Sequence, residues 1–167
     1  MADIKNAYGS SVDLTITLAS LASDSSLLTG RASTAIDETS NKYIDELLAG
    51  FVSTGTSPTT AKEIHVYVYG CINDTPTYPD SITGSDAAKT MTTANIRDAG
   101  LRLAAMLSTT ATSNEKTFFG PISVRYLFGG TLPKKWGVFI THNTGVNLNS
   151  TSGNHKISAT PVYQTVV

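Results

Sequence analysis

The segment 63–69 constrains the fold of this chain more than any other. It reads Glu-Ile-His-Val-Tyr-Val-Tyr, so β-branched or aromatic residues fill almost every position, and Gly70 follows it directly. Strand alternation sorts these side chains into two sets, Ile64, Val66 and Val68 on one face and His65, Tyr67 and Tyr69 on the other. Because both sets are bulky, we expect a strand that is covered on both faces.

Further strand signals recur along the chain at spacings of about ten to twenty residues. Apolar and polar residues alternate throughout the segment 12–19, which predicts the first strand. The same criteria predict strands over 101–110, 117–122, 136–143 and about 155–165. Pro121 suits an edge strand, because proline cannot donate a ladder hydrogen bond.

The segment 42–53 has two readings. Its apolar positions 44, 47, 48 and 51 fall on one face of a short amphipathic helix. The stretch also runs directly into the β-prone Phe-Val-Ser-Thr, which favours a strand with a bulge at Gly50. We prefer the strand.

Little of the chain predicts helix. Residues 86–97 fit a turn or two, and 123–130 fit a single turn with Ser123 as its N-cap and Gly129 after its end. The breaker-rich segment 73–84 predicts a long loop. The sequence therefore predicts an all-β fold in one domain, residues 1–167: a jelly-roll-like β-sandwich of about 7–8 antiparallel strands with one or two short helical turns.

Composition favours contacts with other macromolecules. The chain holds 18 Ser and 25 Thr, and charged residues make up only 15%. Such a surface loses less side-chain entropy when a partner covers it than one rich in long charged side chains. The formal net charge of −1 gives no overall field for nucleic acid or an anionic membrane, so neither is expected as a partner.

Compartment signals are few. Cys71 is the only cysteine, which excludes an intrachain disulfide. The first residues lack the pattern of a signal peptide, and no apolar stretch has the length of a membrane span. We expect the chain to be made in a cytosol, where it is used or assembled into something larger.

The motifs that carry catalysis or cofactor binding are missing. The chain contains no glycine-rich phosphate loop and no Gly-x-Ser-x-Gly elbow. The adjacent acids at 37–38 and 45–46 would point to opposite faces if they lie in strands, which does not suit a glycosidase pair. No catalytic or cofactor-binding residue is expected, and no cofactor.

No metal site is expected either. His65, His142 and His155 would form one only if the fold brought them together. A calcium site from acids of the 73–86 loop is another reading, but their spacing lacks the regularity of an EF-hand loop.

Aromatic residues leave one alternative open. Several could stack on a sugar, although packing in the core is the more frequent role of such side chains. These residues are Tyr67, Tyr69, Tyr78, Phe118, Tyr126 and Trp136. A carbohydrate-binding module for host attachment is therefore a second hypothesis.

The segment 119–140 carries a resemblance. It contains Gly-Pro-Ile-Ser-Val at 120–124, Leu-Phe-Gly-Gly at 127–130 and Leu-Pro-Lys-Lys-Trp-Gly at 132–137, before a strand that ends near the turn 143–145. This run resembles small virion structural proteins of tailed bacteriophages. Tyr8-Gly9, the Leu14 to Leu18 stretch and the segment 42–45 are also similar, so the resemblance covers most of the chain.

The resemblance implies a particle component, assembled in the host cytoplasm and located in the virion. It implies a non-enzymatic capsid decoration or cement protein that binds the major capsid protein, with a tail-associated position as the alternative. A closed homo-oligomer, dimer or trimer, is the expected unit. Edge strands and the 73–86 loop are the expected contacts, and the candidate contact residues are Asp74, Tyr78, Asp80, Lys134 and Lys135.

Overall fold

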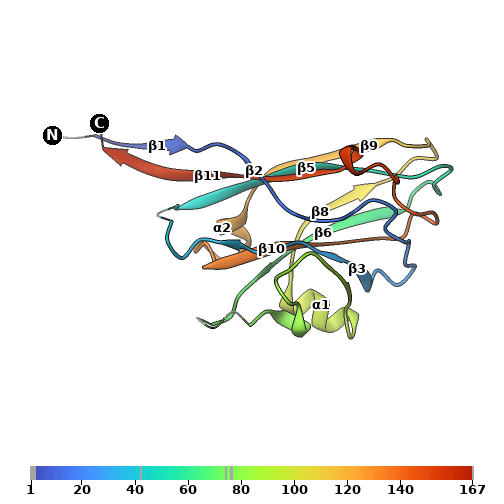
Figure 1. Ribbon diagram of the computed structural model, residues 1–167, viewed down its shortest axis with the longest axis horizontal. Helices are drawn as coiled ribbons and strands as arrows, with labels where there is room; N and C mark the ends of the chain where they lie inside the picture. The colour runs from blue at the N-terminus through green and yellow to red at the C-terminus, as the bar shows by residue number, and fades with distance from the viewer. Residues whose placement is uncertain (1–2, 42, 74, 76, 167) are drawn as a thin grey trace.

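The chain folds as two antiparallel β-sheets packed face to face (Figure 1). The computed structural model describes residues 3–41, 43–73, 75 and 77–166. Eleven strands lie in this described part of the chain, with only short helical segments between them. The prediction of an all-β sandwich is confirmed. No helix in the described ranges is long and apolar enough to cross a membrane.

The first sheet, sheet A, has the strand order β1-β11-β5-β9, and β2 also pairs with β11. Its strands are β1 (Ile4–Tyr8), β2 (Val12–Asp13), β5 (Asp45–Ser53), β9 (Lys116–Ser123) and β11 (Lys156–Val166). Sheet B has the order β7-β3-β10-β6-β8, and β4 also pairs with β10. Its strands are β3 (Thr29–Ala32), β4 (Ile36–Asp37), β6 (Glu63–Gly70), β7 (Ala87–Thr90), β8 (Arg102–Ser108) and β10 (Lys135–His142).

The connections follow the jelly-roll order. In chain order, β2, β3, β5, β6, β8, β9, β10 and β11 lie in sheets A, B, A, B, B, A, B and A. The chain thus crosses from one sheet to the other at nearly every step, as in the eight-stranded double Greek key. β1 pairs with β11 beyond the part that pairs with β2. β4 and β7 are short additional strands of sheet B.

A single apolar core lies between the sheets. Sheet A contributes Leu48, Val52 and Ile157, and sheet B contributes inward-facing residues of β6 and β10. Trp136 and Ile140 of β10 are fully buried in it. The core holds the sheets together by removing these side chains from water.

The outer face of sheet B is covered by residues 77–86 and 91–101, as Figure 1 shows below β10 and β3. This cover includes η1 (Pro79–Ser81) and α1 (Ala94–Gly100). A second apolar cluster forms where it meets the sheet, from Ala32, Tyr67, Tyr69 and Phe139 on the strands and Tyr78, Ile82, Met91 and Leu101 of the cover. The prediction that β6 is covered on both faces is confirmed.

The predicted strand over 12–19 is wrong beyond Asp13. Residues 14–18 belong to neither ladder and cross from sheet A to the end of β3. The Leu14 amide donates to Ile157 O in sheet A, at 2.8 Å, and Thr15 O accepts from the Thr34 amide, at 2.9 Å. The alternation nevertheless marks burial correctly, since Leu14 and Leu18 are in the core.

Other segments differ less from their predictions. The segment 45–53 is a strand, and its pairing with β9 shifts between Leu48 and Gly50, so the strand with a bulge is confirmed. The helix expected over 86–97 begins only at Ala94, because 87–90 pair with β3 as β7. The helical turn α2 (Val124–Leu127) is confirmed, with the Ser123 hydroxyl accepting from the Tyr126 amide.

The burial of Ile140 gives a first prediction. Replacing the fully buried Ile140 with alanine removes apolar contacts between the two sheets and leaves a cavity. We expect Ile140→Ala to lower the free energy of unfolding by about 2–5 kcal/mol in urea titrations. The control is Met106→Ala on β8, where the side chain is 52% exposed and the expected loss is under about 1 kcal/mol. Equal losses would contradict the assignment of the core.

Candidate functional site

Two of the five candidate contact residues lie in the cover of sheet B. Tyr78 is only 7% exposed, and its ring packs edge-on against Tyr69 with 5.2 Å between centroids. The Asp80 carboxylate accepts hydrogen bonds from the amide and the hydroxyl of Thr92, both at 2.7 Å, and lies 3.6 Å from Lys89 Nζ. The hydrogen bonds from Thr92 lower the pKa of Asp80. Both residues hold the cover in place.

Two more candidates lie where β10 begins. Lys135 Nζ is 2.6 Å from Asp37 Oδ2 of β4, a contact that raises the pKa of Lys135. The carbonyl of Lys134 accepts from the Glu38 amide at 2.7 Å. Asp74, the fifth candidate, lies outside the described residues. Contact of these residues with a partner stays a prediction.

One end of the molecule brings Lys134 and part of the 73–86 loop together. A shallow hollow of about 260 Å³ is lined by Cys71–Asn73 and Thr131–Lys134. A second hollow shares Thr131 and Leu132 and lies against Tyr43, Ile44 and Arg125. Ile72 and Tyr126 are exposed at this end, by 71% and 82%. Asp80 instead belongs to the Lys89 and Thr92 side of the cover.

The outer face of sheet A is the surface away from sheet B. Strand alternation directs Lys156, Ser158 and Thr160 of β11 to this face, since Ile157 and Ala159 are buried on the other side. Across the sheet, Phe51 of β5 pairs with Phe118 of β9, with ring centroids 5.3 Å apart. Phe118 is 69% exposed. In Figure 1 no described segment covers this face as residues 77–86 and 91–101 cover sheet B.

A terminal ribbon extends this sheet beyond the sandwich. It consists of β1 and residues 162–166 of β11, which pair from Ile4 with Val166 to Tyr8 with Val162. Figure 1 shows it projecting past the end of β5. Ile4, Tyr8 and Val166 are exposed by 67%, 65% and 73%. Sequence reasoning missed β1, because Ile-Lys-Asn-Ala-Tyr has no apolar alternation that would mark a half-buried strand.

A polar network lies on the outer face of sheet B beside α1. His65 Nε2 is 2.7 Å from Glu63 Oε2, and His65 Nδ1 is 3.2 Å from the Tyr67 hydroxyl. That hydroxyl donates to Asp98 at 3.4 Å, and Arg97 Nε donates to the same carboxylate at 2.7 Å. The Arg97 guanidinium also lies over the Tyr67 ring, 5.2 Å from its centroid. The network lines a hollow of about 330 Å³.

The electrostatics of this network stabilise contact between α1 and sheet B. The hydrogen bond with Asp98 raises the pKa of Arg97, and the hydrogen bond from Arg97 lowers the pKa of Asp98. Burial raises the pKa of the Tyr67 phenol. Arg97 also donates to Leu27 O at 2.7 Å, so the guanidinium joins α1 to the chain before β3.

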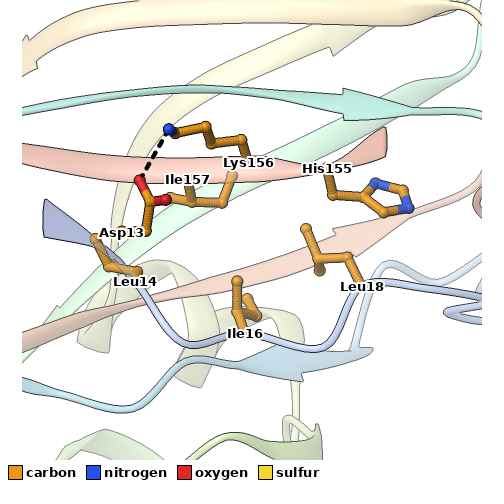
Figure 2. Close-up of a pocket in the computed structure, with 7 residues that line it drawn as sticks. All are labelled: Asp13, Leu14, Ile16, Leu18, His155, Lys156 and Ile157. Carbon is orange, nitrogen blue, oxygen red and sulfur yellow. Dashed lines mark ion pairs between the residues drawn. The ribbon is translucent and has the colours of Figure 1, made fainter. Parts of the chain in front are cut away.

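Figure 2 shows a small hollow between β11 and the crossing segment 14–18. Its volume is about 90 Å³, and Leu14, Ile16 and Leu18 line it from the crossing segment. The dashed line marks the ion pair between Lys156 Nζ and Asp13 Oδ1, at 3.2 Å. The hollow is too small for anything beyond a few waters.

The three histidines occupy separate environments. His142 Nε2 is 3.0 Å from Leu21 O, and burial lowers the pKa of its imidazole to about 4. His155 Nε2 is 2.9 Å from Asn149 O, and burial lowers its pKa as well. His65 belongs to the network beside α1. In the described parts of the chain, no three histidine, cysteine or acidic residues gather as a metal site would require.

Two glutamates, one from each adjacent acidic pair, meet inside the protein. The Trp136 indole donates to Glu46 Oε2 at 2.5 Å, and the Asn41 amide donates to Glu38 Oε2 at 2.9 Å. Burial raises the pKa of Glu38. Burial, followed by the nearby charge of Glu38, raises the pKa of Glu46 to about 8. Sequence reasoning missed this pair because it considered only acids adjacent in the chain.

Most of the aromatic residues considered for sugar stacking are in fact core residues. Trp136 and Tyr69 are fully buried, and Tyr67 and Tyr78 are nearly so. Only Phe118 and Tyr126 of that set expose their rings, one on the outer face of sheet A and the other on α2.

Comparison with known proteins gives no relative. No protein-family model matches the chain, and neither a curated protein nor a solved structure matches it.

The glutamate pair gives a second prediction. Because the pKa of Glu46 is raised to about 8, the folded state keeps a proton that the unfolded state loses above its ordinary pKa of 4.5. The contribution of Glu46 to the free energy of unfolding should therefore fall as the pH rises from about 5 to 8, by up to about 1.4 kcal/mol per pH unit. The lowered pKa values of His142 and His155 act in the opposite direction up to about pH 6.5. Urea titrations between about pH 7 and 8 should therefore show the slope in the natural chain and a flatter one in Glu46→Gln.

The matched control for this prediction is Asp3→Asn, which neutralises an exposed acid outside the strands. It should keep the slope of the natural chain. If Glu46→Gln kept the slope as well, the buried carboxyl would not be its source.

Proposed function

We propose that this chain is a non-enzymatic structural protein of a bacteriophage virion, a capsid decoration or cement protein that binds the major capsid protein. It is assembled in the host cytoplasm and acts through contact surfaces. The resemblance of segment 119–140 to virion proteins supports the proposal that the chain is a component of a virus particle. The segment spans the end of β9, α2 and most of β10, so it builds part of both sheets.

The observation that carries the proposal is the unequal covering of the two sheets. Residues 77–86 and 91–101 cover the outer face of sheet B, whereas the outer face of sheet A exposes Phe118 and continues into the terminal ribbon. An apolar patch on a broad, regular sheet suits contact with another protein. Small and hydroxyl side chains next to it, such as Ser158 and Thr160, lose little entropy when they are covered.

A decoration role is also compatible with a weak contact between each copy and the capsid. Many copies on a regular lattice stabilise a shell because each additional contact is made at high effective concentration. The side chain of Phe118 then acts as an apolar anchor on the capsid surface, and Lys116 and Lys156 lie near it on β9 and β11. A tail-associated position would use the same surface on a different partner.

The test uses purified particles. We expect mass spectrometry to find the chain in virions, and particles that lack it to release DNA at a lower temperature. We expect Phe118→Asp to lower its occupancy on particles, because a charge replaces the exposed ring on sheet A. Ile96→Asp is the matched control, since Ile96 is also exposed but lies on α1 over sheet B. Unchanged composition, stability and infectivity of particles without the chain would overturn the proposal.

Electron microscopy of the same particles separates the two positions. Density for the chain over the capsid lattice supports decoration, and density confined to the tail supports the tail-associated alternative.

Tyr126 favours a second candidate, a carbohydrate-binding module for host attachment. Its ring is 82% exposed beside the hollow that Arg125, Gly130 and Tyr43 line. Exposed aromatic rings can stack on sugar faces. If this candidate is correct, a glycan array should give a signal that Tyr126→Ala abolishes and Phe118→Ala keeps. A clean negative array would remove it.

A further inference from the structure

β1 is an edge strand of sheet A, and on its side away from β11 no other strand of the described residues pairs with it. The Gly9 amide donates to Pro161 O at 2.9 Å. This hydrogen bond identifies which residues next to it along β1 direct their backbone groups toward β11. In an antiparallel ladder, residues alternate between bonding the neighbouring strand and facing away from it. The N–H and C=O groups of Lys5 and Ala7 therefore point to β11, and those of Ile4, Asn6 and Tyr8 point away from it.

The other long edges of the two sheets carry features that discourage pairing with another chain. β9 contains Pro121 and has Gly120 at a φ of +86°, which interrupts a regular ladder. β8 is the edge next to β6, where the pairing register shifts between Val66 and Tyr67. β7 has only four residues. β1 has five regular residues without proline, glycine or a register shift in its pairing with β11.

We propose that β1 pairs antiparallel with β1 of a second copy of this chain, about a two-fold axis at Asn6. In this register Ile4 lies opposite Tyr8 of the second copy, Lys5 opposite its Ala7, and Asn6 opposite its Asn6. Each outward-facing residue then donates one hydrogen bond and accepts one across the axis. The two A sheets become one continuous sheet through the pair of terminal ribbons.

The sequence of β1 favours its own copy in this register. Ile4 of each copy lies opposite Tyr8 of the other, so the dimer contains two such pairs. A pair of an aliphatic and an aromatic side chain stabilises neighbouring strands. If the second β1 were shifted by two residues in one direction, Lys5 would lie opposite Lys5 of the other copy. Like charges directly opposite each other are destabilising. Sliding in the other direction would leave Ile4 without a partner residue. The centred register alone pairs all five residues and keeps the charges apart.

The side chains beside the axis add to this contact. Ile4 pairs with Val166 and Tyr8 with Val162, so all four lie on one face of the terminal ribbon. Dimerisation would place the two copies of this set in two apolar rows across the four strands, one on each side of a polar row formed by Asn6 and Gln164. An isolated two-stranded ribbon is marginal in water, and two more strands would support it.

The first test is the oligomeric state of the full chain by sedimentation velocity and light scattering. We expect a dimer for the natural chain and for Asn6→Ala, and a monomer for Asn6→Pro. Proline is tolerated in the folded chain because the Asn6 amide faces solvent, but it removes a donor at the axis. Circular dichroism should show the same fold in both variants. A monomeric natural chain, a trimer, or a dimer that persists in Asn6→Pro would overturn the inference.

The second test locates the axis by cross-linking in a Cys71→Ser background. Asn6→Cys would place two thiols with Cβ atoms about 5 Å apart, within reach of a short bismaleimide. Ile4→Cys is the matched control, because its two copies would lie about 13 Å apart along the strands. Cross-linking of Asn6→Cys but not of Ile4→Cys is expected. The reverse pattern, or equal yields, would contradict the register.

This inference deepens the proposed function by naming the contact between copies. Both tests use the purified chain without particles, so their failure is distinct from failure of the decoration role. If β1 instead pairs with a strand of another virion protein, the purified chain is monomeric and the inference fails while the particle experiment still succeeds.

Discussion

The burial of β6 and β10 on both faces determines the rest of this structure. The two strands pair at the centre of sheet B, and nearly every residue in them is buried. A strand pair this apolar needs a cover on each side. Sheet A supplies one, and residues 77–86 and 91–101 supply the other. No segment in the described part of the chain forms an equivalent second layer on sheet A, so the outer face of sheet A is the broad sheet surface that stays uncovered.

The sequence predicts the central strands well because their signal is local. Segment 63–69 alternates two apolar sets, and each set faces its own cluster in the structure. Ser123 and Gly129 likewise marked the ends of α2 correctly, since caps depend on a few neighbouring residues. The segment 14–18 failed for the opposite reason. Its alternation reports burial, but the partners of its backbone groups, Ile157 and Thr34, lie far away in the chain.

The candidate sites were harder to predict than the fold. Tyr78 lies in a loop rich in breakers, and only the three-dimensional structure reveals that its ring packs on Tyr69. Glu38 follows β4 of sheet B and Glu46 lies in β5 of sheet A, and the two carboxyl groups meet because the fold brings the end of β4 close to the start of β5. The edge of β1 could not be predicted either, because its importance depends on strand order.

The contact between Trp136 and Glu46 also has a practical value. Trp136 is the only tryptophan, and its indole is fully buried and hydrogen-bonded to a carboxyl group that changes charge near neutral pH. Its fluorescence is therefore an intrinsic probe of one defined point between the sheets. Emission spectra recorded without any label would follow both the loss of packing and the ionisation of that single side chain.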